Sequence, residues 1–345
     1  MSSQTSPFFP TVVIGAGAWG TALAIAIARN GHEVWLWGRD EKHLDEMQAT
    51  HSNERYLPGL AFPETLRIIP NFEQAITEAK HILISVPSIA FSEILQKIKP
   101  LIVDGVPVSW ATKGLTPETG RFLFDTAAEV LMESHPLAII SGPSFAAEVA
   151  KDLPTAVTVA SLDETFAQQL ASAMHSSTLR VYTTHDVLGA QIGGTVKNVL
   201  AIAAGISDGL GYGANARAAL ITRGMAEILR LATSLGAKTE TMFGLSGIGD
   251  LILTCTDDQS RNRQLGLAIG RGLTIEQAMA EVGKTVEGVH AAREVLTRAK
   301  QAGIEMPIVE QVYKILFDGH DPRDSVQALL CREQKPENNL LTSKN

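Results

Sequence analysis

A glycine pattern near the start of the chain restricts the possible folds most. Gly15–Gly20 reads G-x-G-x-x-G; it follows an apolar strand pattern at Thr11–Ile14 and opens an apolar helical pattern at Thr21–Asn30. In such a strand–turn–helix, the first glycine allows the tight turn, the second lets a diphosphate approach the backbone, and the third lets helix and strand pack closely. Free N–H groups at the helix start can then bind the phosphates. We therefore predict a dinucleotide site; the alternative is a chance glycine-rich turn.

The end of the second strand pattern, Glu33–Trp37, indicates which dinucleotide binds. A NAD site usually has an acidic residue there, about twenty residues past the glycines, which binds the ribose 2′-hydroxyl. Here Gly38 occupies the expected position of the acid, and Arg39 follows it. Because an arginine can bind a 2′-phosphate, this favours NADP(H). Asp40 is close enough to keep NAD(H) as an alternative, and Arg39 could also be an ordinary solvated loop charge.

The two halves of the chain have different hydrophobic patterns. In the first half, short β-branched runs alternate with helical patterns, which is typical of βαβ units and a mostly parallel sheet. The runs lie at Thr11–Ile14, Glu33–Trp37, His81–Val86, Val106–Thr112, Leu137–Ser141, Ala156–Ser161 and Leu179–Thr183. From Asp186 onward the patterns are helical, with glycine-rich turns between them. We predict an α/β fold with an N-terminal Rossmann domain (1–184), an all-helical C-terminal substrate and catalytic domain (185–335) and a flexible tail (336–345).

Composition excludes several classes of protein. Of the 345 residues, 19% are charged and 45% are hydrophobic, and 29 Lys and Arg against 37 Asp and Glu give a net charge of −8. Because nucleic acids and anionic membranes bind basic surfaces, we expect neither as a partner. The two cysteines, Cys255 and Cys331, are too few for a disulfide framework and suit a reducing cytoplasm. The scattered histidines form no zinc motif, so we expect no metal.

Two stretches are long and apolar enough to be tested as membrane spans. Thr11–Ala28 has no charged residue, and Val187–Ser207 has only one, Lys197. Glycines interrupt the first stretch, and glycines with a charge lie in the middle of the second, which is unfavourable for a membrane helix. We therefore expect no stable membrane insertion.

Lys197 is the most informative single residue, because it is the only ionisable side chain between Val187 and Ser207. At helical spacing its face carries five small residues: Ala190, Gly193, Gly194, Ala201 and Ala204. They leave space for a ligand, or for a closely packed helix. A lysine removed from water has a lowered pKa, which suits proton transfer near neutral pH. The alternative is a structural lysine that reaches a carboxylate across the core.

Two segments of the second half carry further polar groups. Asp250 is the only charge between Thr241 and Thr256. A buried acid requires a partner, and Lys197 is the candidate. The alternative is that Asp250 is a helix N-cap residue. Ser260–Asn262 precedes a helical pattern and predicts a phosphate-binding helix start, unless Asp258 or Ser260 is only a cap.

Lys113 and the segment Ser141–Ser144 each follow a strand pattern. Ligands of open α/β sheets bind at the carboxyl ends of the strands, so both segments are candidate ligand contacts. Each could also be a plain loop.

Seven motifs together resemble the bacterial soluble NAD(P)-dependent glycerol-3-phosphate dehydrogenase family. They are GAGAWGT (15–21), WATKGL (110–115), SGPSFA (141–146), VKN (196–198), NAR (215–217), GDL (249–251) and SRN (260–262). They occur in the family's order and cover the chain from about Thr11 to Leu330. The glycine motif alone is weakly specific, whereas the ordered set is highly specific.

The resemblance implies a Rossmann domain followed by a helical domain. It also implies interconversion of dihydroxyacetone phosphate and sn-glycerol 3-phosphate with NADP(H), or alternatively NAD(H), which would supply glycerol 3-phosphate for phospholipid synthesis. The implied substrate contacts are Lys113, Gly142, Ser144, Lys197, Asp250, Ser260, Arg261 and Asn262, with Lys197 as proton donor and acceptor. The implied cofactor contacts are Gly15, Gly17, Ala18, Trp19, Gly20, Arg39, Lys113, Ala146, Arg261, Thr285 and Glu287. Ala18 stands where many members have serine, and Thr285 where valine is common.

The mechanism we expect centres on Lys197. As an ammonium it would protonate the developing alkoxide, and as a neutral amine it would remove the hydroxyl proton in the reverse direction. Asp250 would orient Lys197, Lys113 would stabilise the developing negative charge, and Ser260–Asn262 would hold the substrate phosphate.

Two alternative functions remain. One is a related dehydrogenase for hydroxyacids, whose carboxylate Lys113 and Arg261 could bind. The other is a dinucleotide-sensing protein without catalysis, which needs the glycine turn but not Lys197. The apolar helical domain is compatible with a homodimer.

Overall fold

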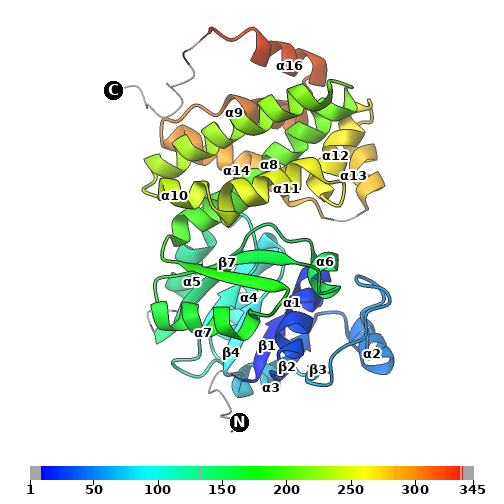
Figure 1. Ribbon diagram of the computed structural model, residues 1–345, viewed down its shortest axis with the longest axis vertical. Helices are drawn as coiled ribbons and strands as arrows, with labels where there is room; N and C mark the ends of the chain where they lie inside the picture. Colours follow the sequence, from blue (N-terminus) through cyan, green and yellow to red (C-terminus); the bar gives the residue numbers. More distant parts are fainter. Residues whose placement is uncertain (1–8, 118, 132–133, 284, 335, 337–345) are drawn as a thin grey trace. The chain divides into compact units, whose positions relative to one another are not determined.

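The computed structural model describes residues 9–117, 119–131, 134–283, 285–334 and 336. Within these ranges the chain forms two compact units (Figure 1). Of these described residues, unit 1 contains those within Met1–Thr112 and Leu123–Val187, and unit 2 contains those within Lys113–Phe122 and Leu188–Asn345. Lys113–Phe122 therefore packs with unit 2, although it lies within the range 1–184. Apart from Pro336, the expected tail lies outside the described residues.

Unit 1 is built on an eight-stranded sheet with the order β3-β2-β1-β4-β5-β6-β7-β8. The strands are β1 (Thr11–Ile14), β2 (Val34–Trp37), β3 (Leu66–Ile68), β4 (His81–Ile84), β5 (Val108–Trp110), β6 (Leu137–Ser141), β7 (Thr155–Ser161) and β8 (Leu179–Thr184). Neighbouring strands are parallel except β6 and β7, in which Ile139 pairs with Ala160. The first six strands have the Rossmann order 3-2-1-4-5-6. The order of the strands along the sheet, not their direction, changes between β1 and β4. The predicted mostly parallel α/β fold is confirmed.

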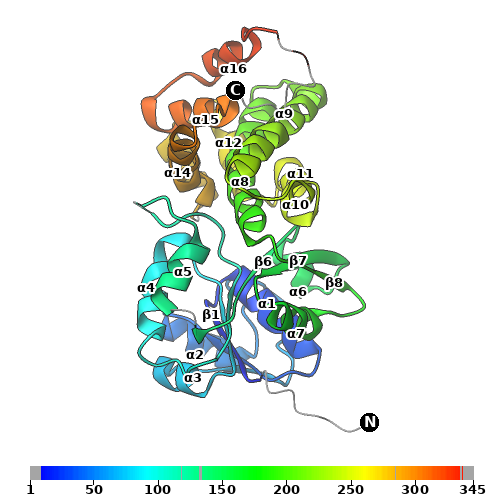
Figure 2. The same ribbon diagram turned by 90° about the vertical axis from the view of Figure 1, so that its left-hand side faces the viewer.

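Helices cover both faces of this sheet. Helices α1 (Ala18–Arg29), α6 (Ala146–Ala150) and α7 (Glu164–Met174) lie on one face, and α4 (Ser88–Ile98) and α5 (Leu123–Leu131) lie on the other (Figure 2). Helices α2 (Glu41–Thr50) and α3 (Phe72–Glu78) connect β2, β3 and β4. Because both faces are covered, the central strands are buried and largely apolar, and all four residues of β1 are buried. The sequence patterns missed β3 and α6, which are too short to show a period.

Unit 2 is helical from α8 onward. Its helices are α8 (Val187–Gly209), α9 (Gly213–Ser234), α10 (Thr239–Met242), α11 (Asp250–Thr256), α12 (Arg261–Gly270), α13 (Ile275–Val282), α14 (Glu287–Gln301), α15 (Pro307–Asp318) and α16 (Pro322–Leu330), with a π-helical turn, η2 (Leu245–Gly249), before α11. One hydrophobic core joins them, and it also includes Leu115 and Phe122 from the Lys113–Phe122 segment. The predicted all-helical C-terminal region is confirmed.

Helix α8 passes through the middle of this core. Among the described helices it alone is long and apolar enough to cross a membrane, but 94% of its most apolar stretch is buried inside the protein. Its glycines admit close neighbours: a Cβ at Gly205 would lie 2.2 Å from the carbonyl oxygen of Arg263, and one at Gly193 would lie 2.1 Å from that of Ser246. From the sequence we expect the small residues near Lys197 to leave space either for a ligand or for a closely packed helix. At Gly193 the small residue serves close packing.

Candidate active site

The glycine loop between β1 and α1 has the geometry that its sequence predicts. Gly15 has a φ of +119°, which favours glycine, and a Cβ there would lie 2.2 Å from the carbonyl oxygen of Ser85. A Cβ at Gly20 would lie 1.9 Å from the carbonyl oxygen of Gly15, whereas no heavy atom lies within 4 Å of the Cβ position at Gly17. Gly15 and Gly20 therefore close the turn, and Gly17 leaves open space beside the backbone for a diphosphate.

The start of α1 also fits an anionic ligand. Gly17 is the N-cap residue, and no side chain caps the helix, whose first turn contains Ala18 and Trp19. The first N–H groups of a helix have no partner within the helix, and the helix dipole makes this end positive. An uncapped helix start beside open space is a suitable site for phosphate. The residues present therefore fit the diphosphate of a dinucleotide.

The end of β2 explains why no acidic residue stands at position 38. A Cβ at Gly38 would lie 2.9 Å from the Cβ of Ala16, so a larger side chain conflicts with the glycine loop. The next residue, Arg39, is exposed. Asp40 caps α2 and accepts a hydrogen bond of 2.8 Å from Nη1 of Arg55. Asp40 therefore has partners within the protein, and the neighbouring Arg39 side chain is exposed.

A second loop of unit 1 follows β6. Gly142 has a φ of +135°, and Oγ of Ser144 donates a hydrogen bond of 3.1 Å to its carbonyl oxygen. Ala146 begins α6, which packs against α1. Because β1, β4, β5 and β6 are parallel, the loops after β1 and β6 lie at the same edge of the sheet, where ligands of open α/β sheets bind.

In unit 2, two lysines meet one aspartate. Nζ of Lys197 on α8 contacts Oδ1 of Asp250, and Nζ of Lys113 donates to Oδ2 of the same carboxylate at 2.7 Å. The side chains of Lys197 and Asp250 are only 7% and 1% exposed. The predicted pairing of Lys197 with Asp250 is confirmed. Gly249 is the N-cap residue of α11, so the alternative of Asp250 as an N-cap is wrong.

The turn before α11 places this aspartate. In η2, Gly247 has φ −100° and ψ −105°, which interrupts the helix, and a Cβ there would lie 2.0 Å from the carbonyl oxygen of Met242. Gly193 of α8 approaches the adjacent Ser246 equally closely. The glycines on both sides therefore let the start of α11 approach α8, and Asp250 reaches Lys197.

The environment shifts the proton affinities of the two lysines differently. Burial lowers the pKa of Lys197 to about 7; Asp250 opposes this shift, and the nearby charge of Lys113 adds to it. Burial also acts to lower the pKa of Lys113, but its contacts with Asp250 outweigh burial and raise that pKa above the ordinary lysine value. Lys113 therefore stays an ammonium, whereas Lys197 can gain or lose a proton near neutral pH.

Two polar residues next to this cluster were not among the predicted site residues. Oγ1 of Thr254 accepts a hydrogen bond of 2.9 Å from Nζ of Lys197 and donates one of 2.6 Å to the carbonyl oxygen of Asp250. Oδ1 of Asn198 accepts from Nδ2 of Asn262 at 3.0 Å. The sequence signals were modest: Thr254 lies one helical turn after Asp250, and Asn198 follows Lys197.

The predicted phosphate site forms the start of α12. Ser260 is the N-cap residue, and its side chain accepts a hydrogen bond from the backbone N–H of Arg263, which confirms the capping alternative. Arg261 is exposed, and its Nη1 donates to the carbonyl oxygen of Thr285 at 2.9 Å. The Asn262 side chain is buried between Asn198 and the backbone N–H of Gly288. This helix start therefore presents an exposed guanidinium, held by one hydrogen bond to Thr285, on a fixed backbone.

Glu287, the first residue of α14, is the remaining predicted charged residue of unit 2. Burial raises the pKa of its carboxyl group, and the positive charges of Arg261, Lys113 and Lys197 act in the opposite direction. Among the described residues, no group of three or more His, Cys, Asp or Glu side chains is arranged to hold a metal. Apart from Arg39 in unit 1, the predicted charged residues thus all belong to unit 2: Lys113, Lys197, Asp250, Arg261 and Glu287. The other predicted residues of unit 1 lie in the loops after β1 and β6 and at the starts of α1 and α6.

Comparisons with known proteins identify the family of this chain. Residues 10–167 match the family model for the N-terminus of NAD-dependent glycerol-3-phosphate dehydrogenase, and residues 186–327 match the model for its C-terminus. The chain is 53% identical over 327 residues to a glycerol-3-phosphate dehydrogenase [NAD(P)+] from Nitrosococcus oceani (95% of each chain). It is 50% identical over 326 residues to one from Idiomarina loihiensis (94% of this chain and 98% of the relative).

A solved structure agrees as well. The crystal structure of glycerol-3-phosphate dehydrogenase from Coxiella burnetii has 47% sequence identity to this chain and a TM-score of 0.91, with 95% of this chain and 100% of that chain covered. Both domains of the family and nearly the full length of these relatives are therefore represented. The chain belongs to the NAD-dependent glycerol-3-phosphate dehydrogenase family.

Proposed function

We propose that this enzyme interconverts dihydroxyacetone phosphate and sn-glycerol 3-phosphate with NADP(H), and with NAD(H) as the weaker cofactor. The observation that carries the proposal is the buried Lys197–Asp250–Lys113 cluster, in which one lysine can exchange a proton near pH 7 and the other stays charged. A ketone reduction requires one proton for the developing alkoxide, and a group with a pKa near the working pH transfers it best. Lys197 meets this requirement.

Each member of the cluster has a separate task. Lys197 protonates the substrate oxygen during reduction and removes the hydroxyl proton during oxidation. Asp250 and Thr254 hold Nζ of Lys197 in one orientation through its hydrogen bonds. Lys113 is fixed on the other carboxylate oxygen of Asp250 and supplies positive charge where the substrate oxygen becomes negative.

The substrate phosphate requires a cationic site. Arg261 has an exposed guanidinium whose carbonyl contact still leaves other donors, and a guanidinium can bind a phosphate through two parallel hydrogen bonds. Ser260 and Asn262 act through the fixed start of α12, because the partners found for their side chains lie within the protein. In unit 1, Gly142 and Ser144 contribute the loop after β6 to substrate binding.

Unit 1 binds the dinucleotide, which supplies the hydride when bound. Gly15, Gly17 and Gly20 admit the diphosphate, the first turn of α1 with Ala18 and Trp19 provides N–H donors, and Arg39 binds the 2′-phosphate of NADP(H). Further contacts come from Ala146 in unit 1 and from Lys113, Arg261, Thr285 and Glu287 in unit 2. Ala18 lacks a hydroxyl, so the backbone supplies the donors at that position.

Further proposals concern the cellular setting. Both cysteines are free thiols, Cys255 buried and Cys331 exposed, which supports a reducing cytoplasm. The glycerol 3-phosphate would supply phospholipid synthesis, and we propose a homodimer as the assembly.

The test is oxidation of NADPH and of NADH by the purified protein with dihydroxyacetone phosphate, compared with 2-keto acids of similar size. We expect turnover with the ketone phosphate only. The Arg39→Ala variant should lose about tenfold in affinity for NADPH, which corresponds to one charge-assisted contact, and little for NADH. Turnover of a keto acid instead would support the hydroxyacid dehydrogenase, and cofactor binding without any turnover would support the dinucleotide sensor.

A further inference from the structure

The segment Lys113–Phe122 occupies an unusual position in the chain. In sequence it lies between β5 and α5, both of which belong to unit 1, yet it packs with unit 2. Its first residue is Lys113, whose Nζ contacts Asp250. Because the chain on both sides of the segment belongs to unit 1, its attachment to unit 2 must come from contacts that its own residues make.

Apolar contacts provide part of this attachment. Leu115 and Phe122 are 2% and 5% exposed and lie in the core of unit 2. An isolated antiparallel bridge joins the two residues, and the backbone N–H of Thr116 donates to the carbonyl oxygen of Arg121 at 2.8 Å. The described residues of the segment are therefore held together by this bridge, and Leu115 and Phe122 insert into the core.

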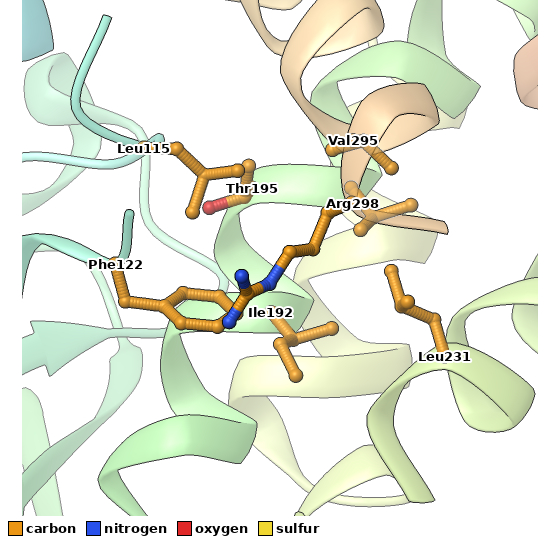
Figure 3. Close-up of a pocket in the computed structure, with 8 residues that line it drawn as sticks. Leu115, Phe122, Ile192, Thr195, Leu231, Val295 and Arg298 are labelled. Atoms are coloured by element: carbon orange, nitrogen blue, oxygen red, sulfur yellow. The ribbon is translucent and has the colours of Figure 1, made fainter. Parts of the chain in front are cut away.

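Helix α14 adds two polar contacts to this loop. The guanidinium of Arg298 lies over the Phe122 ring, 5.4 Å from its centre (Figure 3). One helical turn earlier, the carboxyl group of Glu294 accepts a hydrogen bond from the backbone N–H of Leu115. Glu294 is only 9% exposed, and burying a carboxylate is unfavourable unless it gains a specific partner. Its partner is the backbone two residues beyond Lys113.

We propose that Glu294 and Arg298 are positioning residues for Lys113: they fix the Lys113–Phe122 segment on unit 2 and thereby keep Nζ of Lys113 on Asp250. The inference rests on the proposed roles of Lys113 and Lys197. Neither Glu294 nor Arg298 belongs to the predicted site, and the loop transmits their effect.

Displacement of Lys113 from Asp250 should change a measurable quantity, the pKa of Lys197. The charged and titratable groups that act on or respond to Lys197 are Asp250 and Cys255 from α11, Lys113 from the loop, and Glu287 from α14. The ammonium of Lys113 lowers the pKa of Lys197 and shares the carboxylate of Asp250. If Lys113 moves away, Lys197 loses a neighbouring like charge and gains sole use of Asp250, so its pKa rises.

The experiment is the pH profile of kcat/KM for oxidation of glycerol 3-phosphate, which requires neutral Lys197. The wild-type rate should rise with pH through a limb near pH 7. Glu294→Leu, which removes the acceptor for Leu115, should shift this limb upward by about one pH unit and lower kcat/KM about tenfold at pH 6. Glu294→Gln keeps an acceptor oxygen and should restore the wild-type limb.

Three comparisons make the result specific. Lys113→Met shows the largest shift of the limb that loss of this cation can cause. Glu310→Gln removes an exposed acid that pairs with Lys314 on α15 and should leave the profile unchanged. The substrate phosphate ionises near pH 6, but it does so identically in every variant. A purely structural role for Glu294 would lower the melting temperature without moving the limb.

An unshifted limb in Glu294→Leu overturns the inference and leaves the proposed function intact. A wild-type profile without the limb, or full turnover by Lys197→Met, overturns the proposed function instead. If Glu294→Leu does not fold, Phe122→Leu takes its place, because it keeps an apolar anchor but removes the ring below Arg298. It should shift the limb in the same direction by a smaller amount, and an unchanged limb again counts against the inference.

Discussion

The two units build their candidate sites from different materials. In unit 1 the site is mostly backbone: Gly15, Gly17 and Gly20 contribute a turn, open space and an uncapped helix start. In unit 2 it consists of charged side chains removed from water, Lys197 and Asp250 above all. The glycine loop of unit 1 works because its glycines have no side chains in the way of the ligand or the turn. The lysine–aspartate cluster of unit 2 works because its buried positive and negative charges compensate one another.

This difference decides how each site should respond to mutation. Backbone N–H groups do not titrate, so the diphosphate part of the dinucleotide site should be sensitive to added atoms and insensitive to changes of side-chain charge. The lysine–aspartate cluster should be sensitive to charge, because each buried charge is tolerated only with its partner. The predictions below test this contrast, from the largest expected effect to the smallest.

Lys197→Met should produce the largest effect. The substitution keeps most of the length of the side chain but removes the amine that exchanges the proton, so kcat should fall about 10²–10⁴-fold. The affinity for NADPH, measured by fluorescence titration, should stay within about twofold of the wild type, because the proposed diphosphate and 2′-phosphate contacts belong to unit 1. A variant with near-normal kcat, or with greatly weakened NADPH binding, would contradict the division of tasks between the units.

The sequence revealed these two sites to different extents. The glycine loop is local, and its six residues in a strand–turn–helix context predict both the turn and its purpose. The cluster in unit 2 joins Lys113, Lys197 and Asp250, which are far apart in sequence. An isolated charge in an apolar stretch identifies a candidate, and the pairing of Lys197 with Asp250 followed from charge balance. The contact of Lys113 with the same carboxylate could not be predicted, because it depends on packing of a loop from between β5 and α5 onto unit 2.

A pair of alanine substitutions separates folding from binding within the glycine loop. At Gly20 the new Cβ would lie 1.9 Å from the carbonyl oxygen of Gly15, so Gly20→Ala should destabilise the protein by about 3 kcal/mol through overpacking. At Gly17 the Cβ position is open and the backbone is extended, so Gly17→Ala should change stability little and weaken NADPH binding about tenfold. Urea denaturation and fluorescence titration measure the two effects. Unchanged NADPH affinity in Gly17→Ala would show that the open space at Gly17 has no role in binding.

Two buried titratable groups outside the two sites, His81 and Glu227, predict that the stabilities of the two units respond to pH in opposite directions. In unit 1, burial lowers the pKa of His81 to about 3; the unfolded chain then binds more protons, and stability is lost as the pH falls from about 6.5 towards 3. In unit 2, burial raises the pKa of Glu227 to about 7, although the N–H groups of Ile308 and Val309 oppose the shift. The folded chain then binds more protons, and stability is lost as the pH rises from about 4.5 to 7.

Between pH 6.5 and 4.5 these two contributions have opposite signs, each with a slope of up to about 1.4 kcal/mol per pH unit. Glu227→Gln removes the contribution of unit 2, so the protection of α15 against hydrogen exchange should no longer increase on acidification, after correction for the intrinsic exchange rate. Protection of β4, which contains His81, should still decrease. An identical pH response of α15 in the wild type and the variant would show that Glu227 stays ionised in the folded protein.

The smallest predicted effect concerns Ser260, which the sequence identified as a substrate contact and the structure places as the N-cap of α12. Ser260→Ala should cost about 1 kcal/mol of stability, as N-cap substitutions do. Thr274→Ala at the capped start of α13 is the matched control and should cost a similar amount. If Ser260 acts only through the helix start, both variants should keep the KM for dihydroxyacetone phosphate within about threefold of the wild type. A tenfold rise in Ser260→Ala alone would place its hydroxyl on the substrate, and the anion site of unit 2 would then bind through neutral side chains as well as charge.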